Sequence, residues 1–98
     1  MVYERVPCVY LLASHRNGTL YVGVTSNLAG RVWQHKNNLV DGFTRQYQVH
    51  QLVWYESHAT MESAILREKQ LKAGSRARKI KLIEAMNPEW CDLYQDIL

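Results

Sequence analysis

The stretch CVYLLASHRNGTLYVGV, residues 8–24, decides the fold of this chain. Two runs rich in leucine, valine and tyrosine, 8–13 and 19–24, lie on either side of a polar segment that contains Asn17 and Gly18. An Asn-Gly pair between two such runs is a strong signal for a β-hairpin with a two-residue turn. The sequence therefore predicts that residues 8–24 form a hairpin.

The remaining elements alternate between helix and strand. After the capping side chains of residues 25–27, apolar positions recur at helical spacing, and Asp41 and Gly42 follow. Later helices are bounded by Thr60 and Gly74, and then by Ser75 and Asn87-Pro88. The expected elements are a helix at 27–39, a loop with Phe43 and Arg45, a strand at 51–56, helices at 60–74 and 75–87, and a tail that packs through Trp90, Leu93 and Tyr94. This β-β-α-β-α-α order predicts an α+β fold with a small three-stranded mixed sheet flanked by helices.

Length and composition exclude several classes of protein. The chain has 98 residues, which is enough for one domain with a modest core. With 47% hydrophobic residues, it does not have the composition of a disordered protein. No run approaches the roughly 20 apolar residues of a membrane-spanning helix, and the N-terminus lacks the apolar core of a signal peptide. Cys8 and Cys91 have neither zinc-site nor disulfide-framework spacing. We expect a cytoplasmic protein with no membrane partner.

Positive charge is concentrated in the segment 67–81. This segment holds seven of the twelve basic residues but only one acid, Glu68. Clustered positive charge attracts polyanions such as nucleic acid. A solvated helix surface explains the same pattern, so both interpretations stay open. The basic residues of the segment are Arg67, Lys69, Lys72, Arg76, Arg78, Lys79 and Lys81.

Glu68 is a carboxylate at a position where packing prefers an apolar side chain. The apolar positions of its predicted helix are Met61, Ala64, Ile65 and Leu71. At 100° per residue, Glu68 falls within their stripe, where an unpaired charge is unfavourable by several kcal/mol. Either an i,i+4 pair with Lys72 satisfies the carboxylate, or it is a single ligand for Mg²⁺ or Mn²⁺. The residues alone do not separate these two hypotheses.

Four further residues are candidates for a site. Arg31 and His35 share one face of the first predicted helix, at the edge of its apolar stripe, where two cations could grip a phosphate. A surface pair beside the core is the alternative. Tyr10 and Tyr21 lie on the two arms of the predicted hairpin, where tyrosine usually packs in the core or across strands.

Several of these segments resemble the signature of the GIY-YIG nucleases. Residues 8–10 and 21–23 (CVY and YVG) resemble the paired motif that names the family. Arg31 follows ten residues after Tyr21, and His35 lies one turn further on, as in the first helix of that family. The segment ESAILREKQLK resembles its metal-binding helix, with Glu68 at the acidic position. The resemblance extends from about residue 6 to the end and is strongest to small stand-alone bacterial members.

The resemblance implies a metal-dependent endonuclease that hydrolyses phosphodiester bonds of nucleic acid, with DNA as the expected substrate, in repair or DNA processing. It implies one Mg²⁺ or Mn²⁺ ion on Glu68. The implied catalytic residues are Tyr10, Tyr21, Arg31, His35 and Glu68, and the expected nucleic-acid contacts are Lys36, Lys69, Lys72, Arg76, Arg78 and Lys79. A nucleic-acid-binding module with weak or lost cleavage is the alternative.

Two positions depart from the family pattern. Cys8 stands where the first motif begins with glycine, and Val24 stands where some members carry a lysine or histidine near the phosphate. In the expected mechanism, Tyr10 orients or deprotonates the attacking water, with Tyr21 and His35 hydrogen-bonding around it. Tyr10 and Tyr21 could exchange these roles, and the sequence does not decide between them.

Overall fold

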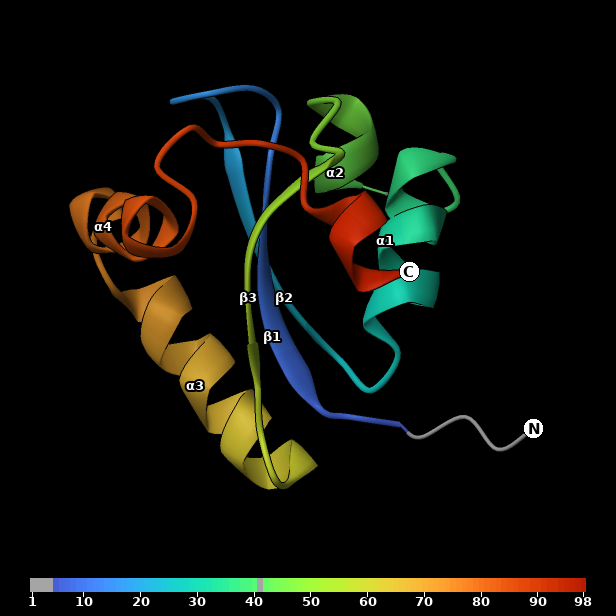
Figure 1. Cartoon of the computed structure of the whole chain (residues 1–98), viewed down its shortest axis with the longest axis vertical. Helices are drawn as coiled ribbons and strands as arrows, with labels where there is room; N and C mark the ends of the chain where they lie inside the picture. The colour runs from blue at the N-terminus through green and yellow to red at the C-terminus, as the bar shows by residue number, and fades with distance from the viewer. Residues whose placement is uncertain (1–4, 41) are drawn as a thin grey trace.

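The elements of the structure follow the expected order (Figure 1). The computed structural model describes residues 5–40 and 42–98. In chain order the elements are β1 (Cys8–Ala13), β2 (Leu20–Thr25), α1 (Leu28–Lys36), α2 (Phe43–Gln46), β3 (Gln51–Ser57), α3 (Met61–Ala73), α4 (Arg76–Met86) and the 3-10 helix η1 (Tyr94–Ile97). The α+β class and the β-β-α-β-α-α order are confirmed. The short helix α2 forms where a loop was expected.

The sheet is antiparallel throughout, so the expectation of a mixed sheet was wrong. Its strand order is β2-β1-β3, and β1 runs antiparallel to both neighbours. β2 and β3 run in the same direction, but β1 separates them and they form no parallel pair. β2 and β3 are therefore the two edge strands, while β1 is central and fully buried.

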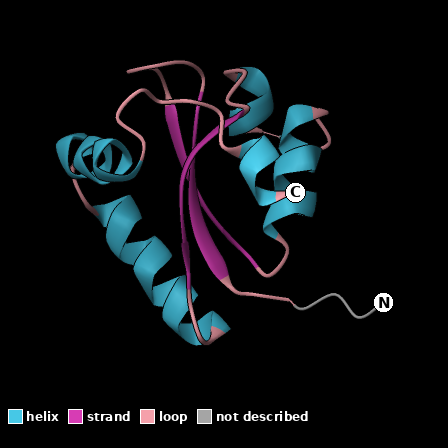
Figure 2. Ribbon diagram, viewed as in Figure 1, coloured by secondary structure: helices cyan, strands magenta, loops and turns pink. Residues whose placement is uncertain are grey.

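Helices cover both faces of the sheet (Figure 2). α3 and α4 lie on one face, where Val9 and Leu11 of β1 join a core with Leu71 and Ile83. α1, α2 and η1 lie on the other face, where Tyr10 joins a second core. Alternate residues of β1 thus point to opposite faces, as the pleat of a strand requires. Odd-numbered β1 residues build one core, and even-numbered residues face the other helical layer.

The hairpin connection is longer than the expected two-residue turn. β1 and β2 are joined by residues 14–19, in which the N–H of Gly18 donates to the carbonyl of His15 at 2.9 Å. Asn17 takes the left-handed conformation, with φ of 60°. Asparagine tolerates this region better than other non-glycine residues, so the Asn-Gly signal marks a real turn but not its length.

Helix α1 ends at Lys36, three residues before the expected end. The N–H groups of Asn38 and Leu39 donate to the carbonyls of His35 and Gln34 at 3.1 and 2.9 Å, and Asn38 has φ of 56°. This is the Schellman arrangement with asparagine in the left-handed position. Leu39 is consequently 62% exposed and does not extend the buried stripe of α1. Asp41, expected to help end the helix, lies outside the described residues.

The caps of the two later helices are confirmed. The Thr60 hydroxyl accepts from the N–H of Ser63 at 3.1 Å, and the Ser75 hydroxyl accepts from the N–H of Arg78 at 3.2 Å. The C-terminal tail also packs as expected, with Trp90 buried in one core and Leu93 and Tyr94 against the other. Among the described residues, no helix is long and apolar enough to cross a membrane.

The expected apolar stripe of α3 was partly wrong. Ala64 and Leu71 are buried, but Met61 and Ile65 are 37% and 39% exposed. The sheet meets α3 along a narrower face than the periodicity suggested, because only β1 and β2 contact it closely. Glu68 is partly buried, and its side chain is 14% exposed.

Candidate active site

Tyr10 occupies the centre of the sheet and leans over its neighbour strand. It is 1% exposed and faces Gly23 of β2 in the strand register. A Cβ atom built on Gly23 would lie 2.2 Å from Cζ and 2.3 Å from the hydroxyl oxygen of Tyr10. Only glycine leaves room for this ring. The hydroxyl of Tyr10 therefore extends over β2, which is an edge strand.

The Tyr10 hydroxyl begins a buried hydrogen-bonded chain. It lies 3.0 Å from Nε2 of His35, and Nδ1 of His35 lies 3.0 Å from Oγ1 of Thr44. His35 is 1% and Thr44 2% exposed. Burial, together with the nearby Arg31 and His50, lowers the pKa of His35 to about 4. His35 is therefore neutral at physiological pH, whereas the sequence suggested a cation at the edge of the helix.

The Tyr21 ring packs beside these hydrogen-bonded groups. Its ring centroid lies 6.3 Å from that of Tyr10 and 5.3 Å from that of His35. On its other side, Phe43 of α2 stacks on Tyr21 with centroids 6.3 Å apart and planes inclined by 28°. Tyr21 remains partly exposed, unlike Tyr10. It is thus the tyrosine of the pair that a ligand could reach directly.

Arg31 and Glu68 both influence the pKa of the Tyr10 hydroxyl. Burial raises the pKa of Tyr10 above its ordinary value, and Tyr21 adds to the rise. The Arg31 guanidinium beside the hydroxyl works in the opposite direction, and the Glu68 carboxylate raises the pKa further. Tyr10 is therefore protonated at neutral pH. The structure brings Tyr21, Arg31 and His35 together around this hydroxyl group, and the charge of Glu68 reaches it from α3.

Glu68 has the helical partner that the sequence allowed. Its carboxylate lies 3.2 Å from the ammonium of Lys72, and its side chain is only 14% exposed, against 55% for Lys72. Among the described residues, no group of three or more His, Cys, Asp or Glu side chains is placed to hold a metal ion. Mg²⁺ commonly binds to one or two carboxylates and completes its shell with water and substrate phosphates. A single sheltered carboxylate whose charge reaches the Tyr10 hydroxyl fits that mode of binding.

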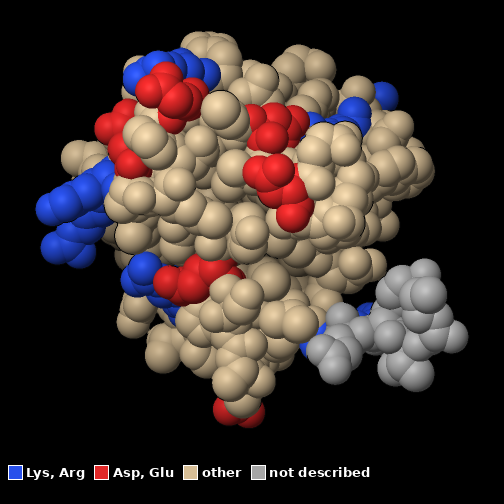
Figure 3. Space-filling view, in the orientation of Figure 1, with Lys and Arg blue, Asp and Glu red and all other residues tan. Residues whose placement is uncertain are grey.

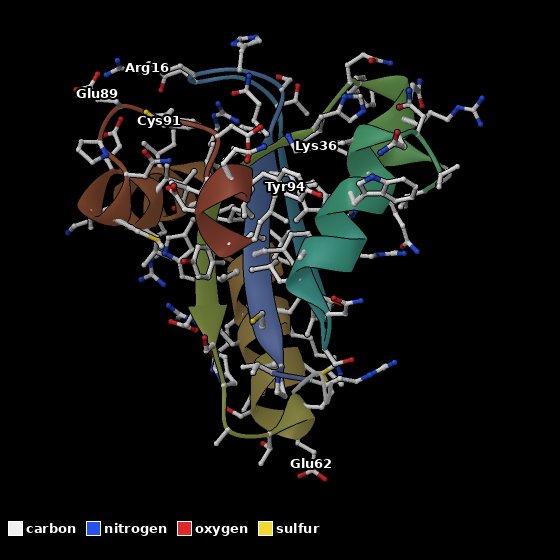
Figure 4. All side chains as sticks on the ribbon, turned by 45° about the vertical axis from the view of Figure 1, so that its right-hand side comes forward. Arg16, Lys36, Glu62, Glu89, Cys91 and Tyr94 are labelled. Carbon is white, nitrogen blue, oxygen red and sulfur yellow. The ribbon has the colours of Figure 1, made fainter. Side chains whose placement is uncertain are left out.

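Several of the expected nucleic-acid contacts are engaged within the protein. The Lys36 ammonium pairs with Asp92 and lies 5.2 Å from the centroid of the Tyr94 ring, on the C-terminal tail (Figure 4). One Arg76 nitrogen donates to the carbonyls of Asn17 and Gly18 at 2.8 and 2.7 Å and so supports the hairpin turn. The tail and the turn, both remote in sequence, thus hold two side chains that the sequence assigned to nucleic acid.

The segment 67–81 divides into engaged and unengaged cations. Lys72 pairs with Glu68, and the Lys79 ammonium donates to the carbonyl of Gly74 at 2.9 Å. By contrast, Lys69, Arg78 and Lys81 are exposed, and their side chains make no hydrogen bond or ion pair with any described residue. On the face that Figure 3 shows, Lys and Arg side chains project from the surface over α4, and acidic side chains lie both next to them and across the middle of the face.

Two hollows lie beside these cations. One, of about 310 Å³, is lined by Arg76, Lys79, Thr19 and Leu20, and Leu20 directly precedes Tyr21 on β2. The other lies between α3 and α4, measures about 770 Å³ and is lined by Arg67, Arg78, Lys81 and apolar side chains. The first hollow thus adjoins the start of the edge strand β2.

Thr44 was missed from the sequence, and Phe43 was placed in a loop. The segment FTRQ is short and polar, and nothing local distinguishes a buried threonine hydroxyl from a solvent-facing one. The packing of α2 against α1 and β2 decides that Thr44 meets His35 and that Phe43 meets Tyr21. Cys8, the departure from the family glycine, is 5% exposed and fits its strand opposite Thr25 and Ser57.

Comparison with known proteins gives a consistent result. The family model for the GIY-YIG catalytic domain matches residues 6–81. A UPF0213 protein of Staphylococcus saprophyticus is 34% identical over 69% of this chain and 83% of its own length. A UPF0213 protein of Desulfotalea psychrophila is 32% identical over 80% of this chain and 72% of its own length. The solution NMR structure of a UPF0213 protein from Bacillus halodurans aligns with a TM-score of 0.52 at 26% identity, covering 84% of this chain and 86% of that one.

Proposed function

Because the chain belongs to the GIY-YIG family of nuclease domains, we propose that it is a metal-dependent endonuclease that hydrolyses phosphodiester bonds of DNA, in repair or DNA processing. The observation that carries this proposal is the grouping of Tyr21, Arg31 and His35 around the Tyr10 hydroxyl, with the Glu68 carboxylate close enough to influence it through its charge. Hydrolysis of a phosphodiester requires an oriented water, neutralisation of charge on the phosphoryl oxygens and help for the leaving oxygen. The grouped side chains can provide the first two.

Arg31 is the residue that we propose to neutralise the phosphoryl charge. Its guanidinium is half-buried, and one nitrogen donates to Gln34 at 3.0 Å, which holds the side chain along α1. A guanidinium presents donors in a planar fork that matches the oxygens of a phosphate. Charge that builds on the nonbridging oxygens is then stabilised without reorganisation of the site.

Tyr10 and His35 are the residues that we propose to accept the proton of the attacking water. Tyr10 is protonated at rest, and while its own proton is directed to His35 its oxygen can accept a hydrogen bond from water. As the water loses a proton to the Tyr10 oxygen, the phenolic proton passes to Nε2 of His35. Tyr21 is more exposed than Tyr10, and the exchange of roles between the two tyrosines remains the alternative.

Glu68 is the proposed metal ligand. An Mg²⁺ or Mn²⁺ ion bound there would polarise the phosphate and stabilise the leaving oxygen. Without an ion, Lys72 neutralises the carboxylate at 3.2 Å. Because Lys72 is 55% exposed, its ammonium can swing into solvent at little cost.

The unengaged cations are the proposed nucleic-acid contacts. Lys69, Arg78 and Lys81 have charges that no described residue neutralises. Arg76 and Lys79 keep further N–H donors beyond those given to carbonyl groups, and they line the hollow that adjoins β2. A phosphate backbone that crosses β2 near Tyr21 would pass this hollow. Lys36 is a weaker candidate, because Asp92 already neutralises it.

A nucleic-acid-binding module without cleavage is the second candidate. The Glu68–Lys72 pair favours it, because this pair satisfies Glu68 without any metal ion. A cleavage assay separates the two candidates. Single-stranded, duplex, flap and branched DNA, and RNA of the same sequences, are incubated with the protein in Mg²⁺, Mn²⁺ or EDTA. Cleavage that requires the metal supports the enzyme, and binding without cleavage on every substrate supports the module.

A further inference from the structure

The short helix α2 supports two residues of the candidate site at once. Gly42 precedes it with φ of 93°, a left-handed conformation that favours glycine, and accepts a hydrogen bond from Gln46 at 3.0 Å. The carbonyl of Thr44 accepts from the N–H of Val49 at 2.9 Å, which fixes the backbone at this residue. From this segment Phe43 stacks on Tyr21, and the buried Thr44 hydroxyl meets His35.

The two hydrogen bonds of His35 constrain each other. Both ring nitrogens have a buried partner at 3.0 Å, Tyr10 on Nε2 and Thr44 on Nδ1. A neutral imidazole carries one N–H and one lone pair, so one partner must donate and the other must accept. The Thr44 hydroxyl can do either. The tautomer of His35 therefore decides which groups donate and which accept in both hydrogen bonds, from Tyr10 to Thr44.

The chemistry of the three groups favours one direction. A phenol is a stronger hydrogen-bond donor than an aliphatic alcohol, and an imidazole nitrogen is a stronger acceptor than a phenolic oxygen. The better match has the Tyr10 hydroxyl donating to Nε2 and Nδ1–H donating to the Thr44 oxygen. The reverse direction pairs the weaker donor, the alcohol, with Nδ1 and makes the phenolic oxygen an acceptor.

We propose that Thr44 is a positioning residue that holds His35 in its Nδ1–H tautomer, so that Nε2 faces Tyr10 as a proton acceptor. The consequence for cleavage rests on the function proposed above, whereas the tautomer of His35 does not. With the Thr44 oxygen removed, Nδ1–H is left without its partner in a buried site. The ring then gains by moving its proton to Nε2, where it donates to Tyr10 and no longer accepts the phenolic proton.

The tautomer is measured directly by ¹⁵N NMR of the histidine rings in the uniformly labelled protein, with His35 assigned from a His35→Gln variant. In the parent we expect a protonated Nδ1 and an unprotonated Nε2. Thr44→Val removes the hydroxyl at nearly constant volume and should shift the proton to Nε2. Thr44→Ser keeps the hydroxyl and should retain the parent pattern.

A parent protonated at Nε2, or a Thr44→Val protein with an unchanged pattern, overturns the proposal. If Thr44→Val fails to fold, the parent and Thr44→Ser spectra still decide it. In the cleavage assay, Thr44→Val should lower kcat about tenfold or more with little change in KM, and Thr44→Ser should recover most of it. A parent that cleaves nothing refutes the proposed function and leaves the NMR result on Thr44 standing.

Discussion

The two helical layers of this protein carry their polar groups in opposite ways. On the side of α1 and α2, the chain from Tyr10 through His35 to Thr44 is buried, neutral and hydrogen-bonded at both ring nitrogens. On the side of α3 and α4, the polar groups are charged and mostly exposed, and several are paired along one helix or with nearby carbonyls. The stability of the first side should therefore depend on packing and pH, and the DNA affinity of the second side should depend on its charges and on salt.

Glu68 joins these two regions, because it belongs to α3 but acts on the Tyr10 hydroxyl. Replacement of Glu68 by Gln should therefore have the largest effect of the substitutions on cleavage. Glu68→Gln keeps the shape and removes the charge for the metal, so cleavage should fall by about a hundredfold or more, while DNA binding persists or tightens. Metal-dependent cleavage and DNA affinity are measured together with the melting temperature.

The matched control for this prediction is Glu62→Gln. Glu62 lies in the first turn of the same helix, is exposed, and points away from the body of the molecule (Figure 4). The Glu62→Gln variant loses the same charge from α3 but leaves the candidate site unchanged, so its cleavage rate should stay near that of the parent. Robust metal-dependent cleavage by Glu68→Gln would remove Glu68 from the mechanism.

The buried, neutral His35 should make the stability of the protein depend on pH. The pKa of His35 falls from 6.5 to about 4 on folding, so the unfolded chain binds more protons between these values. Stability from this group is complete above pH 6.5 and declines as the pH falls toward 4, by up to about 3 kcal/mol. Urea unfolding at pH 4 to 7 measures the decline.

His35 and the exposed His15 give the control pair for this measurement. His35→Gln should flatten the decline between pH 6.5 and 4, and His15→Gln should leave it unchanged, since His15 is exposed at the hairpin turn. Carboxylates that titrate in the same range affect all three proteins equally. Equal slopes for the parent and His35→Gln would show that the buried imidazole is not responsible.

The close contact of Tyr10 with β2 predicts an intermediate effect. A methyl group on Gly23 would lie 2.2 Å from the Tyr10 ring, which the surrounding core holds in place. Gly23→Ala should therefore destabilise the protein by about 1–3 kcal/mol and displace the hydroxyl from His35. Gly74→Ala is the control, because its added methyl meets its nearest atom at 3.4 Å without a positive φ. Equal unfolding midpoints for the two variants contradict the prediction.

The exposed cations should give the smallest effects on stability. Replacing Lys69, Arg78 and Lys81 by Gln should change the free energy of unfolding by less than about 0.5 kcal/mol each. Each side chain that contacts a DNA phosphate should lower the slope of log affinity against log salt by about 0.9. Fluorescence anisotropy of a labelled duplex across salt concentrations measures this slope.

Arg16→Gln is the charge-matched control for the DNA-binding measurement. Arg16 carries the same charge, but it lies in the hairpin connection and pairs with Glu89 at 3.3 Å (Figure 4). Its loss should leave the slope nearly unchanged. If all three substitutions on α3 and α4 behave like Arg16→Gln, this surface does not bind DNA.

Local sequence signals predicted the three strands and the three longer helices, and the sequence also identified the candidate residues. The β-branched and aromatic runs predicted β1, β2 and β3, and the side chains of Thr60 and Ser75 predicted where α3 and α4 begin. These signals work because strand pleating, helical period and capping act over a few residues. The family resemblance identified the candidate residues for a related reason, because the motifs that carry them are short stretches of sequence. These residues are Tyr10, Tyr21, Arg31, His35 and Glu68.

Which of these residues come into contact, and in what protonation state, depends on the tertiary structure. The burial of His35 depends on α2, whose Thr44 comes nine residues later, and the low pKa of His35 follows from that burial. Asp92 neutralises Lys36 from 56 residues away, and Arg76 reaches back 59 residues to the carbonyl of Asn17. A local pattern cannot encode such contacts, because they arise when separate elements pack on one sheet and exclude water between them.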